Sequence, residues 1–343
     1  MVYVLVSGGI DSLVAARLLR QRHDDVVGLH LLTGYNELSA EAVDRLSLRA
    51  GIPVEILDCR SSFEIEVIDY FVREYCRGQT PNPCIRCNSA IKFGVGLDYA
   101  RQRGGNLFAT GHYCRIAESP KGFVLRQGRD RHKDQSYFLA FLKGGQLDRV
   151  CFPLGDLTKT RVRDLARQDG LEPVIKKESQ DICFIPPGSS YGDFIQNRAG
   201  QPPRSGRIED LAGNVIGTHQ GLHRFTIGQR RGINCPAEEP YYVAGIDVTS
   251  NSIRVGTRDQ LHVRQCLVDQ VNWRQLPDKS PAFFSVRVRY RQQAAPALVE
   301  PLPEEKALIT FQQPQFGITP GQGAVFYDQD RVAGAGIIHP DIS

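Results

Sequence analysis

The chain has 343 residues, of which 41% are hydrophobic and 23% are charged, as in an ordinary globular protein. This length is enough for about two or three domains. No apolar stretch approaches the length of a membrane span, and the first apolar run lacks a basic flank and a cleavage site. We therefore expect neither a membrane anchor nor a signal peptide.

The net charge of +4 is unevenly distributed along the chain. Residues 1–100 carry 10 basic and 13 acidic side chains, residues 101–183 carry 16 and 10, and residues 184–343 carry 16 and 15. The positive middle segment suits a polyanionic substrate, although a solvated basic surface would have the same composition. Nine cysteines, without an export signal, indicate a reducing cytoplasm in which they act as thiols or ligands.

Residues 2–6 are apolar and rich in β-branched side chains, which predicts a buried parallel strand. The sequence Ser-Gly-Gly-Ile-Asp-Ser follows at 7–12, and a helical pattern follows at 13–19. Two glycines let a phosphate approach the backbone, while the Ser7 and Ser12 hydroxyls and the helix N-terminus offer donors. The loop lacks the Walker lysine, since the first lysine is Lys92, and it lacks the third glycine of a dinucleotide fingerprint. A tight turn without a ligand is the alternative.

Strands and helices alternate through the first 110 residues. We predict strands at 26–31, 53–57 and 106–110, helices at 39–50, 63–75 and 91–101, and a proline-rich loop at 78–83. This pattern is typical of an α/β doubly wound parallel sheet, in which ligands bind beyond the carboxyl ends of the strands. The 7–12 loop and Gly111-His112 both follow such ends. His112 could equally be a polar residue with satisfied hydrogen bonds.

The pattern changes in the second half of the chain. We predict a strand at 123–126, an exposed polar segment at 130–137, a helix at 160–169 and a boundary at 186–190. Short strands broken by Gly, Pro and Asn then indicate two smaller β-rich domains, so that the domains are 1–187, 188–258 and 259–343. Residues 284–291 alternate like a half-buried strand, on which Arg287, Arg289 and Arg291 share a face toward RNA or solvent.

Cysteines form the second informative pattern. The loop prolines present Cys84 and Cys87 three positions apart, a spacing that lets two thiolates share one metal or cluster, and Cys183 lies 96 residues farther on. Alternatively, Cys84 and Cys87 are half of a structural zinc site that Cys183 and Cys114 complete. The remaining cysteines are predicted to be small buried hydrophobic residues: Cys59, Cys76, Cys114, Cys151, Cys235 and Cys266.

Residues 7–12 resemble the PP-loop of ATP pyrophosphatases, which cleave ATP between the α- and β-phosphates and adenylate a substrate oxygen. From end to end, the chain resembles the tRNA-specific 2-thiouridylases. The segments that carry this resemblance are 7–12, 80–83 with Cys87-Asn88, 91–93, 109–113, 133–138, 152–155, 182–185, 226–230, 289–291 and 319–322.

The resemblance implies an enzyme that thiolates C2 of the wobble uridine of tRNA. ATP adenylates the uracil O2, and a sulfur nucleophile then displaces AMP. The implied ATP and Mg²⁺ site comprises Leu5, Val6, Ser7, Gly8, Gly9, Ile10, Asp11, Ser12, Leu31 and Gly111. The implied contacts with the target base are Asn82, Pro83 and residue 84, and those with tRNA are His112, Lys133, Asp134, Gln135, Arg289, Tyr290 and Gln322. The implied fold is a PP-loop domain, a small central domain and a C-terminal β-barrel that binds tRNA.

In the family, Cys87 matches the nucleophile and Cys183 matches the cysteine that carries a persulfide. The chain departs from the family pattern at three places: Cys84 stands where Asp is usual, the segment after Leu31 is short and lacks an acidic cluster, and Asp181 replaces a common Gly. The first departure brings a third thiol to the site.

Three thiolates, from Cys84, Cys87 and Cys183, can hold a [4Fe–4S] cluster by three irons and leave the fourth open to hydrosulfide. We favour this cluster on the number of thiols. The persulfide route needs only Cys87 and Cys183. Sulfur would come from a donor protein or from free sulfide.

Two other classes of function remain. One is a PP-loop ligase or synthase acting on a small molecule, which would lack the β-rich half and the paired cysteines. The other is a non-catalytic Fe–S or RNA-binding protein, against which the intact loop at 7–12 argues.

Overall fold

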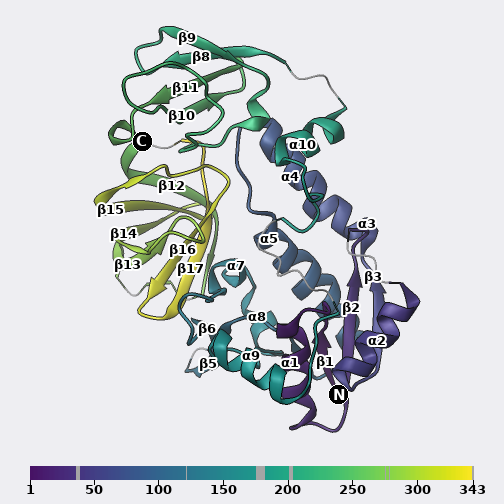
Figure 1. The fold of residues 1–343 in the computed structure, drawn as a ribbon. Helices are drawn as coiled ribbons and strands as arrows, with labels where there is room; N and C mark the ends of the chain where they lie inside the picture. The colour runs from purple at the N-terminus through teal and green to yellow at the C-terminus, as the bar shows by residue number, and fades with distance from the viewer. Residues whose placement is uncertain are drawn as a thin grey trace. The chain divides into compact units, whose positions relative to one another are not determined.

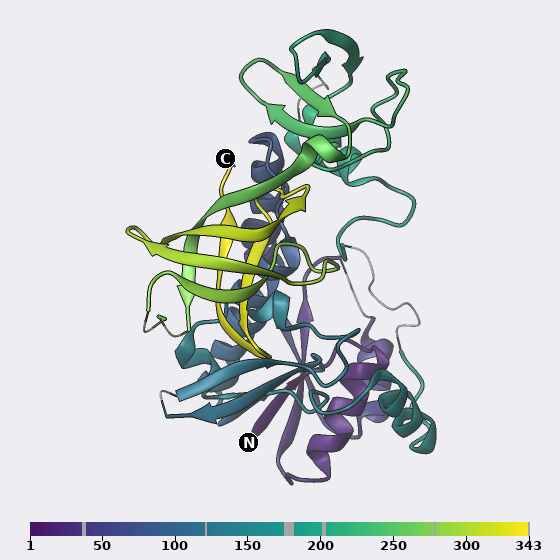
Figure 2. The same ribbon diagram turned by 90° about the vertical axis from the view of Figure 1, so that its left-hand side faces the viewer.

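The computed structural model describes residues 1–35, 39–120, 122–174, 182–200, 204–274, 276–277 and 279–341 (Figures 1 and 2). The chain forms two compact units. The first comprises Met1–Val67, Cys84–Phe184 and Asp330–Val332, and the second comprises Ile68–Pro83, Ile185–Gln329 and Ala333–Ser343. Two of the departures from the family pattern involve residues outside the described ones. These residues are Asp181 and residues 36–38, in the segment after Leu31.

A five-stranded parallel sheet forms the centre of the first unit, in the order β3-β2-β1-β4-β7. Its strands are β1 (Val2–Leu5), β2 (Val26–Leu32), β3 (Val54–Asp58), β4 (Leu107–Ala109) and β7 (Val150–Cys151). The sequence pattern predicted the first four, and the doubly wound parallel sheet is confirmed. β7 has only two residues, too few for a periodic signal.

Three amphipathic helices bury their apolar faces in this unit: α1 (Ile10–Arg20), α2 (Ala40–Ala50) and α9 (Lys159–Gln168). Leu13 and Val14 of α1 pack in one core with Val4 of β1 and Val162 of α9. Ser39 caps α2, because its hydroxyl accepts a hydrogen bond from the Ala42 N–H at 3.3 Å.

Two long helical segments lie between β3 and β4 in the chain. One runs through α3 (Arg60–Phe63), η1 (Glu64–Asp69) and α4 (Tyr70–Cys76), and the other through α5 (Pro83–Arg86), η2 (Cys87–Gly96) and α6 (Leu97–Gln102). The segments η1 and η2 are π-helical, with hydrogen bonds between residues five apart. The second segment corrects the prediction that Cys84 and Cys87 lie on a loop: the loop ends at Asn82, and Pro83 begins the helix, a position that suits its fixed φ.

A hairpin and two short helices complete the first unit: β5 (Cys114–Ser119), β6 (Gly122–Gln127), α7 (Ser136–Leu139) and α8 (Gly144–Leu147). The exposed segment predicted at 130–137 is partly wrong, because Asp134, Ser136 and Tyr137 are buried. Burial of Asp134 is compensated by hydrogen bonds from the backbone N–H groups of Gly128 and Ser136 and from the Ser136 hydroxyl.

The second unit begins with a four-stranded sheet in the order β10-β11-β8-β9, preceded by α10 (Tyr191–Ala199). Its strands are β8 (Gly206–Asp210), β9 (Val215–His219), β10 (Tyr242–Asp247) and β11 (Ser252–Gly256). Phe225 and Ile233 pack on the buried faces of these strands to form a separate small core.

Six strands close into a barrel in the second unit, because β12 pairs with both β15 and β17. They are β12 (His262–Trp273), β13 (Ala282–Arg287), β14 (Ala295–Leu302), β15 (Lys306–Phe316), β16 (Gly323–Asp328) and β17 (Arg331–Ile338). The β-rich half and its terminal barrel are therefore confirmed. The three arginines do not share a strand face, since β13 ends at Arg287 and residues 288–291 turn away from it.

Among the described residues, no helix is both long enough and apolar enough to cross a membrane.

Candidate active site

The loop at 7–12 joins β1 to α1 in a conformation that depends on glycine. Gly8 has φ +82°, in the left-handed region that favours glycine. The Ser12 hydroxyl closes the turn: it donates to the Gly9 carbonyl at 2.8 Å and accepts from the Ser7 N–H at 3.2 Å. The first N–H groups of α1 have no partner within the helix, so the loop presents donors and a positive dipole end.

The loop lies where the order of the sheet reverses, since β1 pairs with β2 on one side and with β4 on the other. Gly111 follows β4 and packs on the loop so closely that a Cβ there would lie 3.1 Å from the Asp11 carbonyl. Leu31 lies near the end of β2. The structure thus brings the predicted ATP-contacting segments to the carboxyl ends of neighbouring strands, where nucleotides bind in such sheets.

A lysine that the sequence reasoning missed also lies at this loop. The Lys159 ammonium is 2.8 Å from each carboxylate oxygen of Asp11, and the Tyr113 hydroxyl donates to the same carboxylate at 2.8 Å. Lys159 is only 6% exposed although it is charged. Lys159 lies outside the motif at 7–12, where Walker loops carry their lysine. The signal in the sequence that could have indicated Lys159 is its position directly after Thr158, the N-cap residue of an amphipathic helix.

The three thiols of interest all belong to the first unit. Cys84 and Cys183 have exposed side chains, whereas Cys87 is half-buried. Cys183 lies in a turn anchored by Phe184, whose buried ring packs against Tyr35 and Phe63 at centroid distances of 6.0 and 6.1 Å. The thiols of Cys84, Cys87 and Cys183 interact electrostatically with one another, so the fold brings together residues that are 96 positions apart.

One cation acts on all three thiols. Displacement of water by the surrounding protein raises the pKa of Cys87 to about 12 and raises the pKa values of Cys84 and Cys183, while the Lys92 charge opposes each shift. Cys84 and Cys183 still reach solvent, and this exposure decides whether a reactant can approach them. Lys92 lies five residues after Cys87 in η2, which is the spacing of the backbone hydrogen bonds in a π-helix. The sequence reasoning assigned Lys92 no role.

Among the described residues, no three His, Cys, Asp or Glu side chains are arranged as ligands of one metal ion. The other cysteines differ in burial. Cys59, Cys114 and Cys266 are buried as predicted, but Cys151 and Cys235 are half-buried, and Cys76 is exposed because it ends α4.

His112 is buried beside the aromatic rings of Phe93 and Phe152. Its Nδ1 is 2.7 Å from the Thr110 hydroxyl. Burial, with the nearby Lys92 charge, holds the pKa of His112 well below its usual range, so the ring is neutral at pH 7.

The residues predicted to contact tRNA or the target base fall in both units. In the first, Lys133 and Gln135 are half-buried, and the Gln135 side chain accepts from the Tyr113 N–H at 3.0 Å. In the second, the Arg289 guanidinium donates to the carbonyls of Ile227 and Gly317 at 2.8 and 2.6 Å. Also in the second unit, Asn82 and Tyr290 are half-buried, Pro83 is buried, and Gln322 is half-buried and donates to the Thr80 carbonyl.

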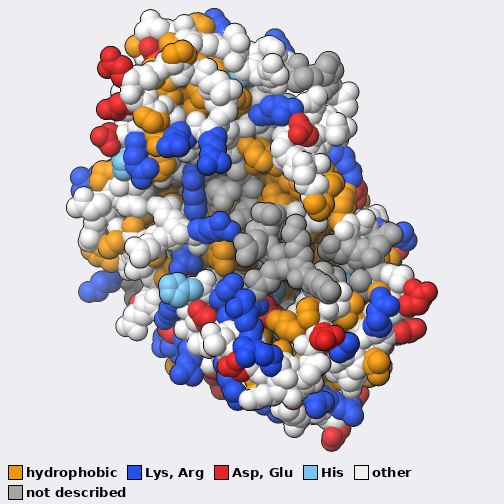
Figure 3. Space-filling model, viewed as in Figure 1, with side chains coloured by type: hydrophobic (Ala, Val, Ile, Leu, Met, Phe, Trp, Pro, Cys, Tyr) orange, Lys and Arg blue, Asp and Glu red, His pale blue; other side chains and the backbone are white. Residues whose placement is uncertain are grey.

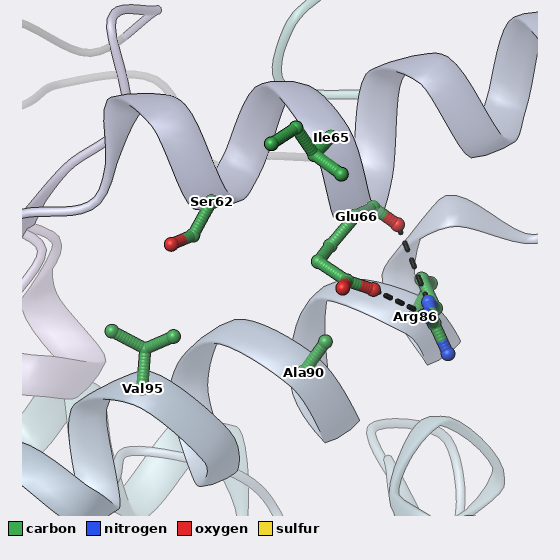
Figure 4. Close-up of a pocket in the computed structure, with 6 residues that line it drawn as sticks. All are labelled: Ser62, Ile65, Glu66, Arg86, Ala90 and Val95. Carbon is green, nitrogen blue, oxygen red and sulfur yellow. Dashed lines mark hydrogen bonds and ion pairs between the residues drawn. The ribbon is translucent and has the colours of Figure 1, made fainter.

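A hollow of about 430 Å³ lies beside α5 and η2, which carry Cys84 and Cys87. Figure 4 shows the side chains that line it. Arg86 of α5 pairs across it with Glu66 of η1. Its lining is Ser62, Ile65, Glu66, Arg86, Ala90 and Val95, and includes none of the predicted site residues. The hollow is therefore distinct from the loop at 7–12 and from the thiols.

Three known families match successive parts of the chain. Residues 1–187 match the tRNA methyl transferase HUP domain, residues 192–257 the tRNA methyl transferase PRC-barrel domain, and residues 263–338 the aminomethyltransferase β-barrel domain. The first of these alone spans more than half of the chain.

The similarity extends over whole relatives. The tRNA-specific 2-thiouridylase MnmA of Desulfosudis oleivorans is 53% identical, over 99% of this chain and 95% of that protein. The protein of the same name from Synechocystis is 44% identical, over 100% of this chain and 98% of its own length. Among solved structures, the U34-tRNA thiolase NcsA of Methanococcus maripaludis, described with its [4Fe–4S] cluster, matches with a TM-score of 0.35 and 19% identity over 58% of this chain and 64% of that one, which is too weak to support an inference. On the full-length identities and the matched domains, the chain belongs to the tRNA-specific 2-thiouridylase family.

Proposed function

We propose that the chain is a tRNA 2-thiouridylase that uses ATP to replace the C2 oxygen of the wobble uridine by sulfur. The observation that carries this proposal is the identity of 53% to a tRNA-specific 2-thiouridylase across nearly the whole length of both chains. The geometry supports it independently, because the first unit holds both a glycine turn whose N–H and hydroxyl groups suit a phosphate and a group of three thiols that interact electrostatically.

The first chemical step is adenylation of the base. The uracil O2 attacks the α-phosphorus of ATP, so that an O–P bond forms as the bond to the bridging oxygen breaks. The electron pair leaves with pyrophosphate, the proton on uracil N3 passes to solvent, and Mg²⁺ accompanies the phosphates. The turn at Ser7–Ser12 supports this step, since its N–H groups and hydroxyls offer hydrogen bonds to phosphate oxygens.

The second step is sulfur transfer. In the persulfide route, the outer sulfur of a persulfide on Cys183 attacks C2, and the C2–O bond breaks so that AMP leaves with the electron pair. The Cys87 thiolate then attacks the Cys183 sulfur, the S–S bond to the transferred sulfur breaks with its electron pair on that sulfur, which takes a proton from solvent, and an external thiol reduces the Cys87–Cys183 disulfide that remains. In the hydrosulfide route, HS⁻ attacks C2, AMP leaves with the electron pair of the C2–O bond, and the S–H proton returns to N3. Cys87 and Cys183 are proposed to be the catalytic thiols, and the side chain of Cys183 is exposed to an incoming sulfur donor.

Cys84 distinguishes two routes for the sulfur. The chemistry of the donor set Cys84, Cys87 and Cys183 supports the cluster route, because three thiolates can hold three irons of a [4Fe–4S] cluster and the charges of these thiols act on one another. Among the described residues the three are not arranged as ligands of one metal ion, so this support comes from their chemistry and not from their geometry. When bound, such a cluster would supply an open iron for hydrosulfide. In that case Lys92 would offset part of the negative charge of the thiolates. In the persulfide route Cys84 takes no part.

Oxygen-free preparations of wild type, Cys84→Ala and Cys76→Ala test these routes. Cys76 is also exposed and lies outside the thiol group, so its variant is a matched control. The cluster route predicts iron in wild type and in Cys76→Ala, and loss of both iron and thiolation in Cys84→Ala. Full thiolation by Cys84→Ala, with no iron in wild type, would establish the persulfide route instead.

A further inference from the structure

We infer that Lys159 is the phosphate-binding cation of the nucleotide site, held in position by Asp11 and Tyr113. The inference rests on the proposed function, because it assumes that ATP binds at Ser7–Ser12. In Walker motifs, a lysine within the loop binds the phosphates. Here that role falls to Lys159, which is 148 positions from Asp11.

The geometry fixes the ammonium group at the loop. Lys159 Nζ lies 2.8 Å from both Oδ1 and Oδ2 of Asp11, which is the second residue of α1. The same ammonium lies 5.9 Å from the centre of the Tyr113 ring, within range of a cation–π interaction. Tyr113 also donates its hydroxyl to Asp11. These three contacts hold the charge beside the first turn of α1.

The backbone of Lys159 is fixed as well. Thr158 caps α9 by accepting from the Arg161 N–H at 3.2 Å, and the Lys159 N–H donates to the Asp130 carboxylate at 3.0 Å. Val162 packs in the same buried core as Leu13 of α1. The helix that carries Lys159 therefore packs against α1, the helix that begins at the loop. This packing fixes the position of the Lys159 backbone.

Charge balance gives the chemical reason. The loop itself offers only N–H groups and hydroxyls, and it contains one acidic and no basic residue. ATP carries several negative charges, and pyrophosphate gains one more as it leaves. The Asp11 side chain is 31% exposed, whereas that of Lys159 is 7% exposed. An ammonium group with so little access to solvent interacts strongly with a phosphate placed against it. Asp11 then acts as a positioning residue for Lys159.

A purely structural ion pair is the competing explanation, and a comparison of ATP with AMP separates the two. We would measure the affinities of both nucleotides by calorimetry, with Mg²⁺, for wild type, Lys159→Gln and Arg161→Gln. Arg161 is exposed on the same helix, so its variant controls for the loss of one positive charge. We expect Lys159→Gln to weaken ATP binding about tenfold or more, as for a lost charged hydrogen bond, and to change AMP binding less than about threefold.

The double variant Asp11→Asn with Lys159→Gln removes both charges, so it avoids an unpaired carboxylate that could repel ATP or destabilise the fold. It should lose ATP affinity in the same selective way. Equal losses for ATP and AMP, or unchanged ATP affinity in Lys159→Gln, would overturn the inference while leaving ATP use by the wild type intact. Failure of wild type to bind ATP would overturn the proposed function and this inference with it.

Discussion

His112 is a buried histidine whose protonation is set by its surroundings. The rings of Phe93 and Phe152 pack against it, the Thr110 hydroxyl is 2.7 Å from Nδ1, and the charge of Lys92 disfavours a second positive charge. The depressed pKa means that folding favours the neutral ring, whereas the unfolded chain binds a proton near pH 6.5. Above pH 6.5, His112 therefore does not lower the free energy of unfolding. As the pH falls below 6.5, it destabilises the fold.

We expect the free energy of unfolding to fall, between pH 6.5 and 5, more steeply in wild type than in His112→Gln. The difference should be on the order of 1 kcal/mol per pH unit while the folded ring stays neutral. Urea unfolding at several pH values measures it. His219 and His223, whose pKa values burial also lowers, are present in both proteins, so their contributions cancel. If the free energy of unfolding depended on pH in the same way in wild type and in His112→Gln, a neutral buried His112 would be contradicted.

The site residues that could be predicted from the sequence are those that belong to short motifs. Ser7–Ser12 and Gly111 could be placed at strand ends because local patterns define those ends. Lys159 could not, since its role depends on a contact with Asp11 across 148 positions. The role of Lys92 could not be predicted either, since its charge acts on three thiols, one of which is 91 positions away in the sequence.

Two short elements of the second unit support each other. The loop that carries Thr80 and Asn82 is attached to the turn at Thr319–Gln322: the Thr80 N–H donates to the Pro320 carbonyl at 2.9 Å, and the Gln322 side chain donates to the Thr80 carbonyl at 2.7 Å. Gly321 has φ +86°, and a Cβ there would lie 3.1 Å from the Thr80 backbone. The turn therefore positions the loop that is predicted to contact the target base.

We predict that Gln322→Ala lowers stability by about 1 kcal/mol, the value of one hydrogen bond, and slows thiolation. Gly321→Ala should cost more, because it adds a clash to the backbone strain. Gly213→Ala is its matched control: Gly213 has φ +90° with open space around its Cβ position. Thermal unfolding and single-turnover thiolation measure both effects. If Gly321→Ala and Gly213→Ala lost equal stability and thiolated equally fast, the turn would have no positioning role.

Elements with a clear period were predictable, and elements fixed by side-chain contacts were not. The periodic strands β1 to β4 and the capped helix α2 match the sequence pattern. The predicted strand at 284–291 is too long because the Arg289 guanidinium binds carbonyls of Ile227 and Gly317, which the alternation of residues cannot reveal. Pro83 similarly begins a helix where two prolines suggested only a loop.

The whole molecule carries its excess of positive charge in residues 101–183. Within this segment α9 exposes Arg161, Arg163 and Arg167, and Figure 3 shows Lys and Arg side chains around the position of α9. Contacts between such side chains and RNA phosphates release counterions, so we expect tRNA affinity to fall steeply with salt. Arg289 donates to two backbone carbonyls, so its replacement would also perturb the fold, and the test uses Lys133.

Lys133→Gln should weaken tRNA binding and reduce the slope of log affinity against log salt by about one unit. Lys143→Gln is the control, because Lys143 is exposed in the same unit and is not a predicted contact. Filter binding over a range of salt concentrations gives both slopes. Identical slopes for wild type and Lys133→Gln would remove Lys133 from the tRNA interface.

The most direct test of the account is a product balance. Purified wild-type protein would be incubated without oxygen with ATP, Mg²⁺, unmodified tRNA and a sulfur source, which is sulfide for the cluster route and a small-molecule persulfide with a thiol reductant for the persulfide route. The position of 2-thiouridine would be determined by mass spectrometry of tRNA fragments, and the nucleotides would be quantified. The account predicts one AMP and one pyrophosphate for each sulfur introduced, with the sulfur at C2 of the wobble uridine. Release of ADP and phosphate, or sulfur at another position, would contradict it.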